Sequence, residues 1–210
     1  MIITYMEKGA NTRKKLLSDA FKLFSSNSYE NVSFSELEKA SGVSRGSMVY
    51  YFKNKNGLFS EVLKTFVFDK SSVKRVPEPY QHSLIAFYNY FIEILEKERN
   101  KLGDLGIKNM NEAFYFIEMS ALLNISDFRD TASTWYEEEK SIWCNIIENA
   151  VFSNEIRKDI DSNRIADLFE KIYLGASFMG VFSIFGADLN VLRTNFDQLY
   201  SLLVNKDNIK

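Results

Sequence analysis

Few residues in this 210-residue chain can interrupt a helix. It contains nine glycines and two prolines, and both prolines, Pro77 and Pro79, lie in one short stretch. Apolar residues recur at three- and four-residue spacings over most of the chain, whereas the alternating β-branched runs that form strands are missing. Hydrophobic residues make up 46% of the chain, which is ample for a packed core. The sequence therefore predicts an all-α fold of about nine helices, the first of which is capped by Asn11 or Thr12.

The residues that usually carry metal, redox or nucleophilic chemistry are scarce. Cys144 is the single cysteine and His82 the single histidine, which excludes an internal disulfide, a multi-cysteine zinc site and a cluster of histidine ligands. The sequence also has no phosphate-binding loop and no dinucleotide fingerprint. We therefore expect no metal, no cofactor and no enzymatic activity. The low cysteine count gives no reason to place the protein outside the reducing cytoplasm.

Charge is unevenly distributed along the sequence. Residues 1–60 hold nine Lys or Arg against five Asp or Glu, whereas the whole chain holds 26 basic and 28 acidic residues. A small basic end on a larger acidic body is typical of a DNA-binding head, because phosphate neutralisation supplies much of the affinity for DNA. The longest uncharged apolar stretch, residues 172–187, is too short to span a bilayer. The expected partner is therefore DNA and not a membrane.

Residues 33–52 have the pattern of two short helices joined by a tight turn. Ser33 and Glu36 form a capping box at the start of the first helix. Gly42 supplies the left-handed residue of the turn, and the small Ala40 suits a close crossing of the two helices. Ser44 can cap the second helix. This arrangement is typical of a helix-turn-helix.

The second helix of this pair is suited to a DNA groove. Its first turn holds small or polar side chains, which build no core but let a helix approach base edges and phosphates closely. Met48 and Phe52 are expected to face the core instead, and the exposed amides at the start of the next helix offer a seat for a phosphate. The residues expected to contact DNA are Ser33, Ser44, Arg45, Gly46, Ser47, Tyr50, Tyr51 and Lys55.

The same residues resemble the tetracycline-repressor (TetR) family of transcription regulators. The matching positions are Ser33, Glu36, Leu37, Gly42, Val43, Ser44, Gly46, Ser47, Tyr51, Phe52, Lys55, Leu58 and Phe59. So many matching residue types at fixed spacings rarely coincide by chance, so the pattern is specific. Two positions depart from it: Glu38 replaces the usual alanine, and Val49 replaces a tyrosine that often touches the DNA backbone. We therefore expect Tyr50 to be the aromatic residue that contacts the backbone.

The resemblance implies two domains. Residues 1–56 would be the helix-turn-helix domain, with its motif at 33–52, and residues 57–210 a helical effector-binding and dimerisation domain. A homodimer would bind palindromic double-stranded DNA, since two recognition helices about one DNA turn apart hold a site that one head would bind too weakly. The dimer interface would be formed by the last two long helices, at about 162–185 and 188–204. Its expected residues are Tyr173, Gly175, Phe178, Gly180, Phe182, Leu192, Phe196 and Leu199.

The aromatic residues of the second domain permit a pocket for a small hydrophobic or aromatic effector. Aromatic residues at helical spacing are more often core residues than ligand contacts; the expected pocket residues are Phe91, Tyr115 and Trp135. The acidic run 137–139 is expected to face water. Effector binding would favour a spacing of the two heads that no longer fits DNA, so the expected protein is a ligand-responsive repressor. Two alternatives stay open: a helix-turn-helix regulator controlled by a protein partner, and a helical enzyme or carrier.

Overall fold

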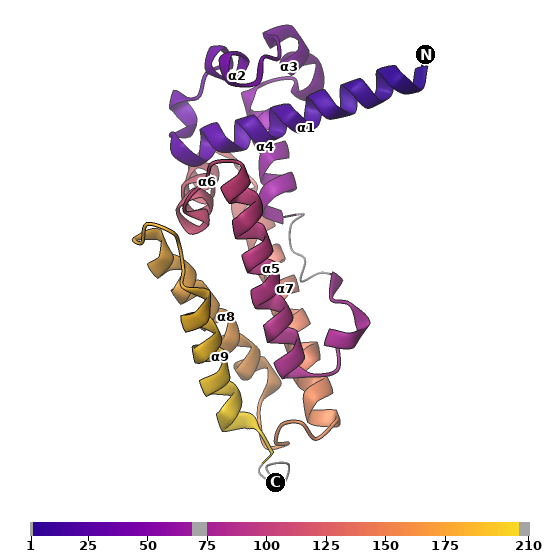
Figure 1. Ribbon diagram of the computed structural model, residues 1–210, viewed down its shortest axis with the longest axis vertical. Helices are drawn as coiled ribbons and strands as arrows, with labels where there is room; N and C mark the ends of the chain where they lie inside the picture. The colour runs from indigo at the N-terminus through magenta and orange to yellow at the C-terminus, as the bar shows by residue number, and fades with distance from the viewer. Residues whose placement is uncertain (1, 69–74, 206–210) are drawn as a thin grey trace. The chain divides into compact units, whose positions relative to one another are not determined.

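The computed structural model describes residues 2–68 and 75–205, and its elements are labelled in Figure 1. Within these ranges the chain forms nine α-helices and no strand, which confirms the predicted all-α fold. One isolated bridge joins Ile156 to Val204. None of the described helices is both long enough and apolar enough to cross a membrane.

By packing, the chain divides into two compact units. The first contains residues 1–70 and 112–129, and the second contains residues 71–111 and 130–210. Helix α6 (Met110–Asn124) therefore begins in the second unit and continues in the first. By packing, α4 (Lys55–Leu63) and most of α6 group with the N-terminal helices, and the functional boundary predicted after residue 56 stays a prediction.

The first unit is built from the four N-terminal helices and α6 (Figure 1). A short 3-10 turn at Tyr29–Asn31 connects the first two helices, and a π-helical turn at Lys64–Phe68 extends the fourth. The bounds of the four helices are α1 Ile2–Ser26, α2 Phe34–Ser41, α3 Arg45–Phe52 and α4 Lys55–Leu63.

Aromatic side chains form the core of this first unit. The ring centroids of Phe24 and Phe59 are 4.6 Å apart, and Tyr29 packs on both rings at 5.8 and 5.0 Å. Phe21 stacks on Phe66 at 4.4 Å and meets Phe114 of α6 at 5.9 Å. Ring pairs of this kind add about 0.5–1.5 kcal/mol each beyond the burial of their surface. They bind α1, α4 and α6 into one core.

Helix α1 starts at Ile2, so the predicted start at Asn11 or Thr12 is wrong. The stretch before Asn11 contains no proline, and its single Gly9 costs a helix only about 1 kcal/mol. A residue that can cap a helix marks a possible start, but it does not end a helix that already runs through it.

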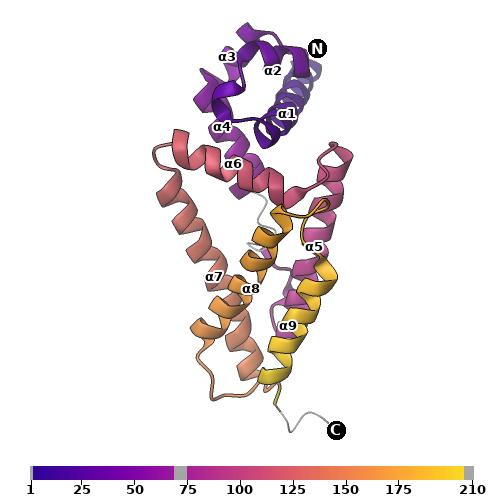
Figure 2. The same ribbon diagram turned by 90° about the vertical axis from the view of Figure 1, so that its left-hand side faces the viewer.

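The second unit packs four long helices around one aromatic core. Helices α8 and α9 run side by side in both views (Figures 1 and 2). Trp143 lies at the centre of the core, stacked on Phe169 at 5.1 Å and edge-on to Phe87 and Phe91 at 4.7 and 5.4 Å. The helix bounds are α5 Leu84–Asp104, α7 Phe128–Phe152, α8 Ser162–Val181 and α9 Leu189–Leu203.

Helix α8 ends at Val181, before the predicted end at residue 185. The chain then reverses through Gly186, whose φ of +84° is a conformation that a side chain would strain. Helix α9 follows at Leu189, with Asp188 accepting hydrogen bonds from the backbone N–H groups of its first turn. The predicted bounds of α9, 188–204, are correct to within one residue at each end.

Two asparagines at the junction of α5 and α6 bind this turn. The buried Asn109 amide donates to the carbonyl oxygens of Gly180 at 3.0 Å and Ser183 at 2.7 Å. The side-chain oxygen of Asn111 accepts a hydrogen bond from Ala187 N–H at 2.8 Å. Asn109 thereby adds a side-chain donor to the carbonyls at the end of α8, of which Gly180 O also accepts from Ser183 N–H at 3.1 Å.

A carboxylate caps the start of α5 from a distant part of the sequence. The two oxygens of Glu155 accept hydrogen bonds from the backbone N–H groups of Leu84 and Ile85, both at 3.1 Å. The hydroxyl of Tyr200, on α9, donates to the same carboxylate at 3.0 Å. Glu155 therefore connects the segment after α7 with the start of α5 and the end of α9, and it places negative charge where the helix dipole favours it.

Candidate nucleic-acid interface

The start of α2 is fixed by the capping box predicted at Ser33 and Glu36. The Ser33 hydroxyl accepts from Glu36 N–H at 3.2 Å, and Glu36 Oε2 accepts from Ser33 N–H at 2.7 Å. Hydrogen bonds from the Ser33 backbone and hydroxyl lower the pKa of Glu36, because they favour its charged form. Ser33 is exposed, but its side chain is engaged in the cap.

The turn between α2 and α3 is closed by Gly42 and by a buried serine. Gly42 has φ 69° and donates its N–H to Glu38 O, as the left-handed end of α2 requires. The hydroxyl of Ser41 donates to Leu37 O at 2.6 Å and accepts from Val43 N–H at 3.1 Å. Ala40 is exposed, so the expectation that it fills the helix crossing is wrong. The neighbouring Ser41 is buried instead, and its hydroxyl makes hydrogen bonds with the backbone of the turn.

Helix α3 presents its first turn to the surroundings. Ser44 caps the helix by accepting from Ser47 N–H at 3.3 Å, while Arg45 and Gly46 are exposed. A methyl group at Gly46 would meet no other atom within 4 Å, so packing does not require glycine there. Met48 and Phe52 are buried, which confirms the predicted inward face.

Two aromatic residues continue the exposed side of α3. Tyr50 is 83% exposed, and its ring contacts the ring of the half-buried Tyr51 edge-on at 5.4 Å. Val49, where the family pattern has tyrosine, is 43% exposed. Tyr50 is therefore more exposed than Tyr51 and Val49, as the predicted contact between Tyr50 and the DNA backbone requires.

The link between α3 and α4 holds two features that the sequence did not reveal. Lys53 has φ 66° and ψ −53°, and Asn54 N–H donates to Phe52 O at 2.8 Å across it, which makes a γ-turn with a positive φ. Gly57 lies against the same oxygen, because a methyl group at this position would be 2.1 Å from Phe52 O. The only signal for Gly57 was a glycine inside a helical stretch.

The predicted phosphate ligand Lys55 is engaged within the unit. Its Nζ donates to Tyr29 O at 2.9 Å and lies 4.1 Å from the centre of the Tyr29 ring. The Tyr29 hydroxyl in turn donates to Asn56. These contacts connect the start of α4 with the turn after α1, so Lys55 has a role in the fold whether or not it contacts DNA.

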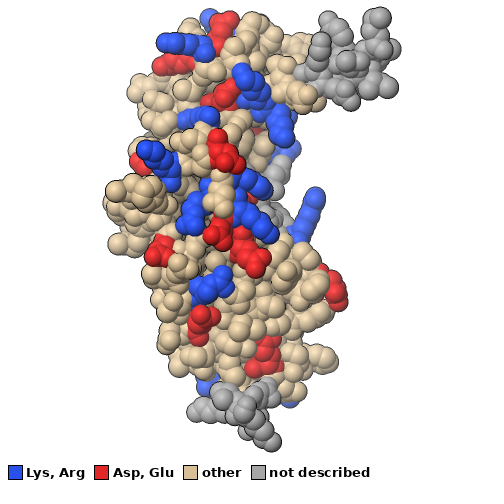
Figure 3. Space-filling view, in the orientation of Figure 1, with Lys and Arg blue, Asp and Glu red and all other residues tan. Residues whose placement is uncertain are grey.

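Basic residues of α1 are also used inside the unit. Arg13 forms an ion pair with Glu61 and lies 5.3 Å from the centre of the Phe52 ring. Lys15 donates to Ser41 O at the end of α2. On the face shown in Figure 3, acidic and basic side chains both lie over the N-terminal helices. The positive charge of this part is therefore a net excess and not a continuous patch on that face.

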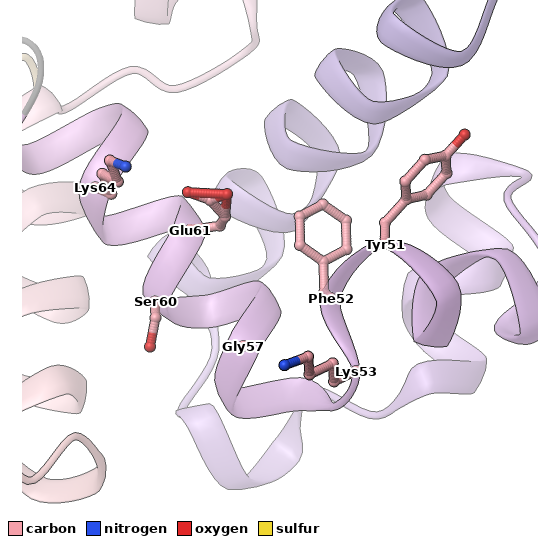
Figure 4. Close-up of a pocket in the computed structure, with 7 residues that line it drawn as sticks. All are labelled: Tyr51, Phe52, Lys53, Gly57, Ser60, Glu61 and Lys64. Atoms are coloured by element: carbon pink, nitrogen blue, oxygen red, sulfur yellow. The ribbon is translucent and has the colours of Figure 1, made fainter.

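A hollow of about 300 Å³ opens beside the link between α3 and α4. In Figure 4 the side chain of Lys53 lies beside Gly57, on the side of the link away from Tyr51. The single acidic lining residue, Glu61, is paired with Arg13. The hollow is lined by Tyr51, Phe52, Lys53, Gly57, Ser60, Glu61 and Lys64.

The residues predicted for a dimer interface separate into two groups. Phe178 of α8 is 51% exposed and Phe182, just after the end of α8, is 74% exposed; Gly175 of α8 is exposed as well. Leu192 and Phe196 are buried in the core of their own unit, so their assignment to an interface is wrong. The physical reason is that α9 turns this side toward α5 and α7, which a partner cannot reach.

The remaining three predicted interface residues are buried or partly buried. Gly180 is buried, and a methyl group there would be 2.5 Å from Ala187 N, so its small size serves the α8–α9 turn and not a partner. Tyr173 and Leu199 are partly buried against the core of the second unit. Gly180 is thus a third wrong assignment, after Leu192 and Phe196, while Tyr173 and Leu199 stay predictions.

The three predicted pocket residues have different surroundings. Phe91 is buried and packs edge-on against Trp143 at 5.4 Å and Tyr173 at 5.0 Å. Trp135 is partly buried and contacts Tyr136 edge-on at 5.0 Å. Tyr115 is exposed and belongs to the first unit, whereas the other two belong to the second. A shared effector pocket for them stays a prediction.

In the part of the chain that is described, no group of titratable residues forms a metal site. Burial raises the pKa of Glu118 and of Glu170 to about 7, but these residues belong to different units. Of the acidic run 137–139, Glu137 and Glu138 are exposed as expected, whereas Glu139 is buried. Each residue of a helix points about 100° away from the last, and three consecutive side chains cannot share one face.

Comparison with known proteins identifies the first unit. The model for bacterial regulatory proteins of the tetR family matches residues 16–62, from the second half of α1 to the end of α4. Over these residues the chain is similar to the tetR family. The tetR-family match contains the capping box, the Gly42 turn, α3 and the Lys53 link. Members of this family are DNA-binding regulators of transcription.

One curated regulator and two solved structures are also similar to this chain. The chain is 39% identical to the HTH-type transcriptional regulator AcrR of Shigella flexneri over 56 residues. These residues make up 27% of this chain and 26% of AcrR. NalD, the secondary repressor of the MexAB-OprM multidrug efflux pump in Pseudomonas aeruginosa, aligns with 95% of this chain and 98% of its own (15% identity, TM-score 0.65). A SmeT–triclosan complex aligns with 93% of both chains (13% identity, TM-score 0.68). At these identities the solved structures show that the fold is shared.

Proposed function

We propose that the protein binds a palindromic operator as a homodimer and leaves it when a small hydrophobic or aromatic compound binds its second unit. The observation that carries this proposal is the exposed first turn of α3, which lies within the tetR-family match. Ser44, Arg45, Gly46 and Ser47 can approach base edges and phosphates there, because no side chain of the unit covers a methyl group at Gly46.

The proposed dimer is supported by the apolar side of α8. Leu174, Phe178 and Phe182 recur every four residues and are 40%, 51% and 74% exposed. Val191 and Leu202 of α9 are exposed as well. A contiguous apolar surface of this kind favours contact with a second copy, since a two-fold axis places the same surface on both partners.

The proposed effector is supported by relatives and by composition. The SmeT complex contains triclosan, which is a statement about SmeT alone. Both tryptophans of this chain lie in its second unit, together with many of its 18 Phe and 11 Tyr, and aromatic side chains are typical of pockets for hydrophobic compounds. Phe91 and Trp135 are the residues of that unit proposed to contact the compound.

Selection of bound duplexes from random DNA, followed by a mobility-shift assay, tests DNA binding. We expect a palindromic consensus and salt-sensitive binding, which Arg45→Ala weakens by at least about tenfold, as loss of a base or phosphate contact does. Arg164→Ala, at the exposed start of α8, is the matched control and should bind normally. Failure to enrich any sequence would overturn the proposal, whereas enrichment without release by hydrophobic compounds would overturn only its effector part.

The dimer is tested by Phe178→Asp, which places a charge on the exposed apolar side of α8. The variant should sediment as a monomer and bind the selected operator more weakly, because each head alone makes half of the contacts. Its helical circular dichroism should be unchanged, since Phe178 is outside the buried core. A variant that stays dimeric with normal affinity would show that this side of α8 is not the interface.

A further inference from the structure

The start of α4 carries two lysines with opposite surroundings. Lys55, which the family pattern makes the expected phosphate ligand, has its ammonium on Tyr29 O at 2.9 Å and over the Tyr29 ring at 4.1 Å. Lys53 is exposed, and within the described residues its ammonium has no hydrogen bond and no ion pair. One lysine is therefore held by the fold, and the other is free to meet a ligand.

The backbone at Lys53 is unfavourable for a residue with a side chain. Its φ of 66° with ψ −53° forms the γ-turn closed by Asn54 N–H on Phe52 O. Glycine adopts positive φ without strain, whereas other residues kept in such conformations are concentrated at functional sites. The backbone conformation alone would favour glycine at this position, which makes the charge of Lys53 a candidate for a role outside the turn.

The turn cannot relax locally, because its oxygen is packed from both sides. Phe52 O accepts the Asn54 hydrogen bond, and Gly57 of α4 lies so close to it that a methyl group would be 2.1 Å away. Asn54 in turn caps α4 by accepting from Gly57 N–H at 2.8 Å. The Lys53 side chain therefore leaves the backbone in a direction set by the crossing of α3 and α4.

The surroundings of Lys53 are positive. Lys64 and Ser60 line the same hollow, and its one acidic residue, Glu61, is paired with Arg13 (Figure 4). A DNA phosphate that approaches the α3–α4 link would therefore meet the Lys53 ammonium without a competing carboxylate, and an ammonium is a good hydrogen-bond donor to a phosphate oxygen.

We propose that Lys53, and not Lys55, provides the cation that binds a DNA phosphate at the α3–α4 link, and that the strained turn persists because it presents this ammonium. The inference rests on the proposed function and sharpens it, since it assigns the contact to a residue outside the family pattern. Lys55 then acts as a positioning residue that holds α4 against the turn after α1.

The test measures affinity for the selected operator as a function of salt, together with thermal unfolding, for Lys53→Gly, Lys53→Arg and Lys55→Met. Each lost phosphate contact makes the slope of log K against log salt shallower by about 0.9. Lys53→Gly should show this flattening and weaker binding, with a Tm equal to or higher than that of the wild type. Lys53→Arg should keep the slope, and Lys55→Met should lower the Tm but keep the slope.

Three results would overturn the inference. An unchanged slope in Lys53→Gly means that Lys53 contacts no phosphate. A clearly lower Tm for Lys53→Gly means that the charge serves the C-terminal end of α3 instead, as the helix dipole would favour. Flattening in Lys55→Met alone assigns the contact to Lys55. Absence of salt-dependent binding by the wild type would overturn the proposed function as well, so the two failures are distinguishable.

Discussion

Two glycines of the first unit, Gly46 and Gly57, have different surroundings. Gly57 is enclosed, with Phe52 O where its side chain would be, whereas Gly46 on α3 faces open space. The first glycine is therefore required by the crossing of α3 and α4. The second has no structural reason to be glycine, and glycine in a helix is less stable than alanine by about 0.5–1 kcal/mol.

Gly46→Ala should therefore separate folding from binding. We expect the same or a slightly higher Tm, together with at least about tenfold weaker operator binding, because a methyl group holds the α3 backbone away from the groove. Gly57→Ala is the matched variant and should lose about 1–3 kcal/mol of unfolding free energy through overpacking. Normal DNA affinity in Gly46→Ala would show that α3 does not approach DNA closely at this residue.

At the scale of elements, long-range contacts fix helix ends. The carboxylate of Glu155 binds two backbone N–H groups at the start of α5 and the hydroxyl of Tyr200 on α9. Asn109 does the equivalent at the end of α8, where it donates to two carbonyl oxygens at 3.0 Å or less. Both residues are distant in sequence from the helix ends they complete.

Replacement of Glu155 by alanine should destabilise the second unit. Two helix N–H groups and one partly buried phenol lose their acceptor, which costs about 1–3 kcal/mol. Tyr200→Phe removes one of these bonds, and its smaller loss of about 1 kcal/mol calibrates the effect. Urea unfolding of the three proteins measures the difference, and equal stability of Glu155→Ala and wild type would contradict this role.

Asn109→Asp should be at least as harmful as Asn109→Ala. Aspartate keeps the size of the side chain but puts a negative oxygen where an amide now donates to Gly180 O and Ser183 O. Alanine removes both of these hydrogen bonds, at about 1–3 kcal/mol, and aspartate adds repulsion at the negative end of the α8 dipole. Denaturant midpoints rank the variants, and an aspartate variant as stable as the wild type would contradict the donor role.

The parts of the fold that could be predicted from the sequence are the local ones. The capping box at Ser33 and the left-handed Gly42 depend on residues within one turn, and both are confirmed. The Lys55 contact with Tyr29 and the Gly57 contact with Phe52 arise only when helices cross, so a pattern of residue types could not reveal them. Likewise, α8 and α9 are apolar on more than one side, and the pattern could not decide which side of α9 its own core covers.

At the scale of the whole molecule, buried carboxyl groups make stability depend on pH, and Glu170 is the one that belongs to the second unit. Burial raises the pKa of Glu170 to about 7 from its ordinary 4.5; Asp167 and Glu137 add to this rise, and Lys140 opposes it. The folded protein therefore binds a proton that the unfolded chain has lost between these pH values. Stability from this group is complete below the unfolded pKa and is lost as the pH rises through the folded one.

Glu170→Gln removes this dependence. The Tm of the variant relative to that of the wild type should increase as the pH is raised from about 5 to about 8, because only the wild type must bury a charge at the higher pH. Glu137→Gln is a control on an exposed neighbour and should change the profile less. A difference between Glu170→Gln and wild type that is constant over this range would show that Glu170 titrates normally.

The division of α6 between the two units has a consequence for modular exchange. Residues 112–129 pack with the N-terminal helices, where Phe114 meets Phe21, while Asn111 holds the turn between α8 and α9. A DNA-reading head transplanted as residues 1–70 alone would leave part of its own core behind. Recombination between similar proteins would thus succeed most readily when residues 112–129 are exchanged together with the N-terminal helices. A single crossover cannot exchange both segments without residues 71–111 between them, so it would rarely produce a stable protein with a new operator specificity.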